Sequence, residues 1–244
     1  MFKRSSIHLI LPAFMMLVLS ACMGKPLNPE VKQKIKTTEV RLIIKQPEIY
    51  GAVVHNNNNA IGGIFGTVTA VASISAKEER VKRNEKAIKP VVKALKGYKV
   101  QSLAKQVYAA GLKRVEWMSP STVKVVNRDL STEERNEITR KSKADAVIFV
   151  DVDYRLNETF KSLEVNTRSQ MYHEHARASG AEPDIIYRAY HTYKWDLPNN
   201  ADGIYDHHKL GKKWSKNRAK VLKSKIREGL EEEVKFLVSE LHKS

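Results

Sequence analysis

The chain contains a single cysteine, Cys22, which directly follows a short apolar segment at the N-terminus. Residues 1–21 begin with the basic pair Lys3 and Arg4, continue with an apolar run over residues 7–18, and end with Leu-Ser-Ala. A basic start, an apolar centre and small residues before a cleavage site are typical of an export signal. The apolar run is shorter than the about 20 residues that a spanning helix needs. A chain exported with one cysteine forms no internal disulfide, so its fold depends on core packing.

The end of this segment, Leu19-Ser20-Ala21-Cys22, resembles the lipobox of bacterial lipoproteins. The resemblance implies that the cysteine is lipidated on sulfur and becomes the new N-terminus. Several acyl chains on one residue anchor a protein durably, because each buried CH₂ contributes about 0.8 kcal/mol. The alternative is an ordinary secretory signal with a chance cysteine. Met23 follows the cysteine, where an Asp marks inner-membrane retention in enteric-type lipoproteins, so the resemblance implies an outer-membrane lipoprotein that faces the periplasm.

The positive charge of the chain favours anionic partners. The formal charge is +16, and removal of Lys3 and Arg4 with the signal leaves +14. Excess Lys and Arg favours association with anions. Behind an export signal we expect an anionic surface, such as lipid headgroups or cell-wall carboxylates, and no nucleic acid. The alternative is that the charge only aids solubility.

Three parts follow from the pattern along the chain: a signal peptide over residues 1–21, a lipidated N-terminus and tether over residues 22–38, and one domain over residues 39–244. The 223 residues from Cys22 onward suit one domain of ordinary size. Pro26, Pro29 and a basic run indicate the tether.

The domain reads as strand, helices, β-meander and terminal helix. The residues 144–152 form the strongest strand signal, an apolar run typical of a central strand. Ser131 and Glu134 form a capping box at the start of a helix. The pattern predicts an α+β fold, with a mixed or antiparallel sheet of about 4–5 strands, helices packed mainly on one face and a long C-terminal helix. The predicted strands are 39–45, 50–54, 144–155, 163–172 and 185–195. The predicted helices are 60–89, 101–110, 132–143 and 215–242. Pro90 ends or kinks the first helix, Gly97 breaks the helical stretch that follows it, and Gly111 stops the second helix.

Residues 60–76 are uncharged and rich in small side chains. Gly62, Gly66 and Ala70 lie four residues apart, which is a ridge that allows close helix packing. The segment is expected to pack against the sheet or a partner. The alternative is insertion into lipid, although the 17 residues fall short of a span.

Two histidine-containing stretches are candidate metal ligands. His173 and His175 are two residues apart and, on a strand, face the same side. Asp206-His207-His208 is the second stretch. Neither has the longer ligand spacing of a known site, so we expect polar strand-end and loop histidines, and no metal or cofactor.

Two carboxylates and a group of aromatic residues on the predicted strands are further candidates for a functional site. Asp151 and Asp153 share a face of the central strand, where paired carboxylates serve acid–base chemistry or cation binding. No nucleophile motif or phosphate-binding loop accompanies them, so we expect ion pairs with arginines or lysines of neighbouring strands. The second group is an aromatic–basic surface or a partly buried strand face, made of Tyr187, Tyr190, Tyr193 and Trp195.

The order of lipobox, early strand, small-residue helix, Ala144–Val150 strand and long hairpin resembles a loose group of bacterial envelope lipoproteins. More remotely it is similar to the α/β domains of the curli secretion channel and of the penicillin-binding-protein activators. The resemblance implies an envelope assembly role and carries over no binding or catalytic residue.

These observations predict a lipid-anchored envelope protein with a non-catalytic assembly, tethering or regulatory role. Its expected partners are the membrane and an envelope protein or further copies of the chain. One alternative is a membrane-active or pore-like oligomer that uses residues 60–76. Another is a metal-binding or hydrolytic periplasmic protein.

Overall fold

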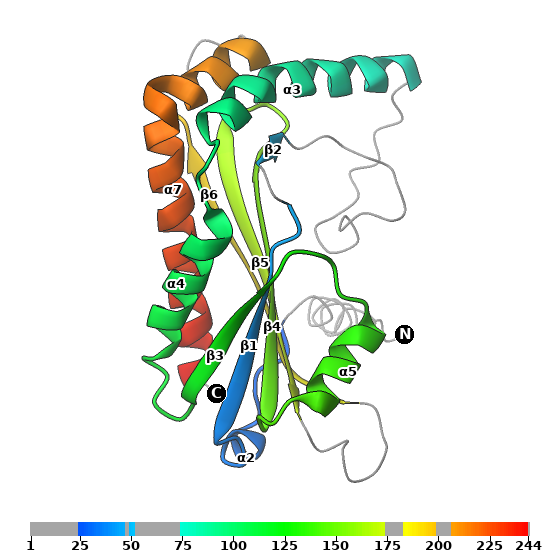
Figure 1. The fold of residues 1–244 in the computed structure, drawn as a ribbon, viewed down its shortest axis with the longest axis vertical. Coiled ribbons are helices and arrows are strands. Elements are labelled where there is room, and N and C mark those ends of the chain that lie inside the picture. Colours follow the sequence, from blue (N-terminus) through cyan, green and yellow to red (C-terminus); the bar gives the residue numbers. More distant parts are fainter. Residues whose placement is uncertain (1–23, 47–48, 52–73, 174–182, 199–205, 244) are drawn as a thin grey trace, which may run out of the picture.

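The computed structural model describes residues 24–46, 49–51, 74–173, 183–198 and 206–243. Their centre is a mixed sheet with the strand order β3-β1-β4-β5-β6 (Figure 1). The strands β3, β1 and β4 run parallel to one another. β5 is antiparallel to both of its neighbours, β4 and β6, and the short β2 pairs with the end of β4. The strands are β1 (Thr37–Ile43), β2 (Tyr50–Gly51), β3 (Ser119–Val126), β4 (Ala146–Leu156), β5 (Ser162–His173) and β6 (Ile185–Asp196).

The predicted α+β class is confirmed, and the strand predicted to be central is central. β4 lies between β1 and β5, and its first five residues are buried on both faces. Along β4, Ile148 and Val150 join the main core, whereas Val147 and Phe149 join a smaller core on the other face. Alternation sends successive side chains to opposite faces, so a run without polar residues fits a strand that is covered on both sides.

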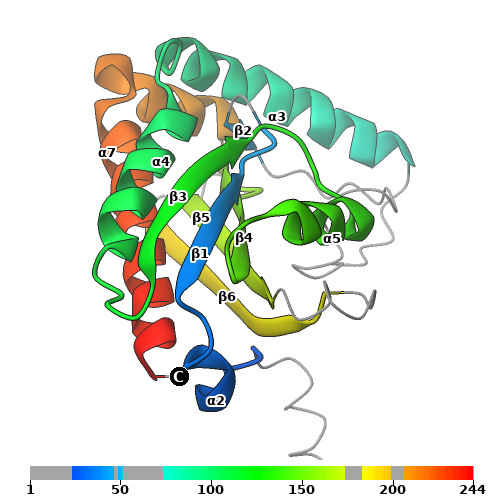
Figure 2. The ribbon, with the colours of Figure 1, turned by 60° about the horizontal axis from the view of Figure 1, so that its bottom comes forward.

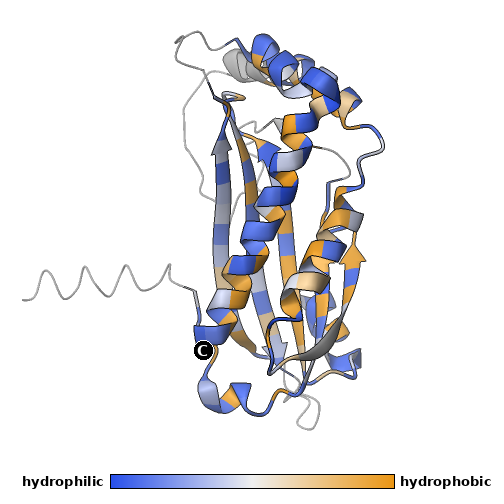
Figure 3. Ribbon diagram, turned by 90° about the vertical axis from the view of Figure 1, so that its left-hand side faces the viewer, coloured by the Kyte–Doolittle hydropathy of each residue, from blue (hydrophilic) through white to orange (hydrophobic). Residues whose placement is uncertain are grey.

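The helices lie mainly on one face of the sheet, as predicted. α4 (Val100–Leu112) and α7 (His207–Lys243) cover this face, and α3 (Ile74–Ala94) crosses its end. Figure 3 shows hydrophilic and hydrophobic residues recurring along the outer helices. α5 (Thr132–Lys141) lies over the opposite face (Figure 2). No helix in the described part of the chain has the length and apolar character needed to cross a membrane.

The capping box of α5 is confirmed. The Glu134 backbone N–H donates to Ser131 Oγ at 3.3 Å, and Glu134 Oε2 accepts from the Ser131 backbone N–H at 2.9 Å. Each bond satisfies a backbone donor that the first helical turn leaves without an intrahelical partner.

The C-terminal helix differs from its predicted form. α7 begins at His207 and changes direction at 216–219, where Asn217, Arg218 and Ala219 adopt left-handed backbone angles. The segment before the change packs across α3, and Gly211 makes the close approach: a Cβ there would lie 2.1 Å from the carbonyl oxygen of Ala87. The segment after it runs along the sheet (Figure 1). The hydrophobic periodicity of residues 215–242 did not predict this change of direction, because it depends on packing of the first segment against α3 and of the second segment against the sheet.

One predicted helix end is wrong, because α4 continues through Gly111 to Leu112. Close packing explains why this helical position is a glycine: a Cβ at Gly111 would lie 2.0 Å from Val234 Cγ1 on α7. Of the two alternatives for Pro90, an end of the helix is excluded, because α3 continues past it to Ala94. Gly97, with φ of +82°, lies in the turn between these helices, as predicted.

The described part of the predicted tether packs against the domain. It contains α2 (Pro29–Lys32), and Leu27 and Ile35 on either side of it are buried in the main core. Lys25 forms a bridge to Arg188 of β6.

Candidate functional site

Several predicted site residues lie outside the described residues. These are the lipidation candidate Cys22, the possible metal ligand His175 and the small-residue ridge Gly62, Gly66 and Ala70. The structure leaves these predictions as they stand.

The described histidines of the candidate metal stretches have structural surroundings. His173 ends β5, is 7% exposed, and its backbone N–H donates to the Asp184 carbonyl at 3.3 Å. Asp206 immediately precedes α7, and its Oδ1 accepts from the backbone N–H groups of His208 and Lys209 at 3.0 and 3.1 Å. Among the described residues, no three His, Cys, Asp or Glu side chains are placed to share a metal ion.

Asp151 and Asp153 face the same side of β4 but have separate partners. Arg135 of α5 donates to both oxygens of Asp151, at 2.7 and 3.2 Å. Asp153 accepts from the Tyr50 hydroxyl at 2.7 Å and from Asn166 at 3.3 Å. The expected ion pair is present for Asp151, although its arginine comes from a helix and not from a neighbouring strand.

The aromatic residues of β6 divide between the two faces of the sheet. Tyr187, Tyr193 and Trp195 pack against the main core on the helix side, whereas Tyr190 is 37% exposed on the other side. The four residues therefore do not form one surface, and the partly buried strand face is the interpretation that holds.

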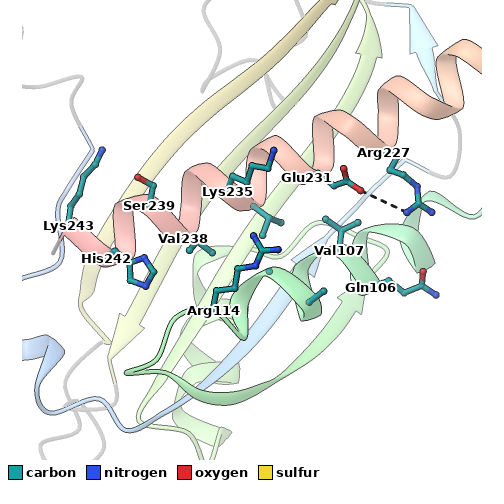
Figure 4. A pocket seen from close by; sticks show the side chains of 13 residues that line it. Gln106, Val107, Arg114, Arg227, Glu231, Lys235, Val238, Ser239, His242 and Lys243 are labelled. Atoms are coloured by element: carbon teal, nitrogen blue, oxygen red, sulfur yellow. Dashed lines mark ion pairs between the residues drawn. The ribbon is translucent and has the colours of Figure 1, made fainter.

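A groove of about 870 Å³ runs between α4 and α7 (Figure 4). Volumes of about 300–1,000 Å³ are usual for binding pockets. The lining residues from Arg227 to Lys243 follow one side of α7, so the groove extends about 24 Å along the helix at 1.5 Å per residue. Its apolar floor is formed by Val107, Ala110, Gly111, Val234 and Val238.

The small size of Gly111 shapes this floor. Because Gly111 has no side chain, Val234 of α7 occupies the space beside α4, and the two helices approach closely. A glycine at a helix–helix contact lowers helix propensity by about 1 kcal/mol relative to alanine, and close packing accounts for its presence.

The rim of the groove is positively charged. Arg114, in the turn just after α4, and Lys235 of α7 lie near each other across it (Figure 4). The ion pair with Glu232 raises the pKa of Lys235, and the neighbouring Arg114 opposes that rise. Arg227 is paired with Glu231 at 3.9 Å, and His242 and Lys243 line the far end. An apolar floor between cations suits an amphipathic ligand that carries negative charge.

A polar network lies behind the groove, between α7 and the sheet. Glu233 is 1% exposed and accepts from the Tyr193 backbone N–H at 2.9 Å and from the Thr167 hydroxyl. His191 Nδ1 lies 3.0 Å from Glu233 Oε1, and the His191 ring stacks on Phe236. Burial raises the pKa of Glu233, although His191 and the hydrogen-bond donors oppose the rise. Sequence reasoning missed this group, because a Glu within a charged helical segment gives no sign of burial.

Comparison with known proteins finds similar folds only at low scores. No family model matches the chain, and no curated protein matches it. The hypothetical protein CT253 from Chlamydia trachomatis matches with 8% identity and a TM-score of 0.28, over 85% of this chain and 99% of that one. A PelC dodecamer from Paraburkholderia phytofirmans matches with 14% identity and a TM-score of 0.28, over 74% and 88% of the two chains. A second PelC dodecamer structure matches with 13% identity and a TM-score of 0.27, over 78% and 87%. TM-scores this low do not establish a common fold.

Proposed function

We propose that the chain is a lipid-anchored protein of the bacterial envelope that binds a partner protein and catalyses no reaction. The anchor is Cys22, which ends an export signal. The proposed location is the outer membrane, with the domain in the periplasm. The observation that carries the binding role is the α4–α7 groove, which combines an apolar floor with a positively charged rim.

The proposed occupant is an amphipathic helix of the partner that carries acidic residues. Helices bind such grooves through apolar side chains three and four residues apart. The groove length of about 24 Å corresponds to roughly 16 residues of helix. Acidic side chains beside the apolar stripe would relieve the repulsion between Arg114 and Lys235.

Site-specific cross-linking in cells tests the groove. A photo-reactive residue in place of Val238, on the groove floor, should capture one defined envelope protein. The same residue in place of Glu133, exposed on α5 at the opposite face of the sheet, should not capture it. No product at Val238, or the same products at both positions, would contradict a binding groove.

Charge reversal on the rim should reduce the cross-link from Val238. Arg114→Glu should lower its yield about tenfold, equivalent to about 1.4 kcal/mol of binding free energy. The matched control is Lys113→Glu, because Lys113 is the exposed neighbour of Arg114 and does not line the groove. Equal yields from the two variants would show that the rim charge has no role.

A further inference from the structure

A cluster of arginines lies on the face of the sheet opposite the groove. Arg168 and Gln170 are two residues apart on β5 and therefore share this face, and Arg188 of β6 is directly opposite Gln170. Arg135 reaches this face from α5, which lies over it (Figure 2). Its guanidinium lies over the Phe149 ring, 5.4 Å from the ring centroid. Because Arg168 and Arg188 are diagonal neighbours, about 7–8 Å separate their positions on the sheet. Arg135, Arg168 and Arg188 are called the arginine cluster below.

One carboxylate pairs with the arginine cluster in the described residues. Asp151 accepts two hydrogen bonds from Arg135 and is opposite Arg168 in the β4–β5 register. Three positive charges and one negative charge leave an excess of two. Burial raises the pKa of the Tyr172 hydroxyl; the three guanidinium groups oppose that rise, and Asp151 adds to it. Like charges in a partly buried position repel, and an anion relieves the repulsion.

The cluster also contains hydrogen-bond donors that have no acceptor in the described part of the chain. Gln170 is 1% exposed; its Oε1 accepts from Arg135 at 3.3 Å, whereas its Nε2 has no partner among the described residues. The same holds for the buried Nε atoms of Arg168 and Arg188. Buried donors without acceptors are rare in folded proteins, so these three require an explanation. Tyr190, opposite Arg168, is 37% exposed, so the cluster opens to solvent at β6.

We propose that the arginine cluster and Gln170 bind a phosphate monoester. A monoester carries a charge of about −1.5 to −2 at neutral pH, which matches the excess of two, and its three oxygens accept hydrogen bonds from guanidinium and amide groups. A carboxylate would neutralise only half of this excess. In the envelope, the monoester belongs either to a soluble phosphorylated sugar or to a lipid headgroup.

The response to inorganic phosphate tests this proposal. The full chain, purified in detergent at constant ionic strength, should bind phosphate in calorimetry and unfold at a higher temperature when phosphate is present. Arg168→Gln should weaken phosphate binding at least about tenfold, because it removes charge-assisted hydrogen bonds. Binding should also weaken as the pH falls below neutral, because the inorganic phosphate dianion then takes up a proton and loses half of its charge.

The matched control is Arg155→Gln on the same face of the sheet. Arg155 is already paired with Glu164 at 3.0 Å, so its loss should leave phosphate binding unchanged. In phosphate-free buffer, Arg168→Gln should unfold at a higher temperature than the parent, because it removes an uncompensated charge. If Arg168→Gln unfolds at a lower temperature than the parent and the parent binds no phosphate, the proposal is contradicted. The charge and donors of Arg168 would then have partners within the chain itself.

Two monoester probes distinguish the sources of the phosphate. Glucose 6-phosphate represents a soluble sugar phosphate, and vesicles with phosphatidic acid represent a lipid monoester, with phosphatidylglycerol vesicles as the diester control. Binding of either monoester that is lost in Arg168→Gln supports the site. Equal binding of the parent and Arg168→Gln to both probes would contradict it.

Discussion

Replacement of Trp214 by alanine should destabilise the domain by about 3–5 kcal/mol, the usual cost of removing a buried aromatic side chain. Trp214 is 1% exposed and packs edge-on against Trp195, with ring centroids 5.6 Å apart. Its Nε1 donates to the Phe160 carbonyl at 2.7 Å. The side chain thus connects the first segment of α7 to the β4–β5 turn, and its loss leaves a cavity and an unpaired carbonyl.

Chemical denaturation of the parent and Trp214→Ala measures this loss. Val221→Ala is the matched control, because Val221 is in the same helix and is 50% exposed. The control should change the free energy of unfolding by less than about 0.5 kcal/mol. A Trp214 variant as stable as the Val221 variant would show that the first segment of α7 does not pack on the sheet as described.

Removal of the buried carboxyl of Glu233 should have the second large effect. In Glu233→Leu the Tyr193 backbone N–H and the Thr167 hydroxyl lose their acceptor. A buried donor left without an acceptor costs about 1–3 kcal/mol. Glu232→Gln is the control, because Glu232 is on the outer side of α7 in a surface pair with Lys235, and such pairs contribute about 0–1 kcal/mol. Equal free energies of unfolding for the two variants would contradict the network.

The same carboxyl should give the domain a measurable pH dependence. Folding raises the pKa of Glu233, so the folded state holds its proton more tightly than the unfolded state. The stabilisation is therefore complete below the unfolded pKa, about 4.3, and is lost as the pH rises through the folded pKa. Glu233→Gln does not titrate at this position. The measurement is the free energy of unfolding of the parent minus that of Glu233→Gln, as a function of pH. This difference should fall as the pH rises. A difference that rises with pH would contradict the raised pKa.

The sequence predicted most of the fold because the strand signals are local. The apolar run of β4 and the alternation of β5 and β6 reflect burial on one or two faces, and periodicity records burial directly. The edge strand β3 was missed. Pro120 near its start weakens the strand pattern. Proline is nevertheless tolerated on an edge strand, and among the described strands β3 pairs with β1 alone. Its signal was the short run Val123–Val126.

The candidate sites were less predictable, because they depend on contacts between distant segments. Gly111 looked like a helix stop, whereas its role comes from Val234 in another helix. Arg135, Arg168 and Arg188 are far apart in the chain and come together through strand register and the position of α5. Glu233 is in a charged stretch whose inner side is visible only once the helix is placed on the sheet.

Membrane fractionation of the parent and Cys22→Ser tests the lipid anchor most directly. Cys22 is the only cysteine, so serine removes the one position for an acyl thioether. The parent should be found in the membrane fraction and leave it only with detergent. Cys22→Ser should be exported to the periplasmic soluble fraction, with the thermal unfolding midpoint of the parent domain. A Cys22→Ser protein that remains an integral component of the membrane would contradict the anchor and favour insertion by residues 60–76.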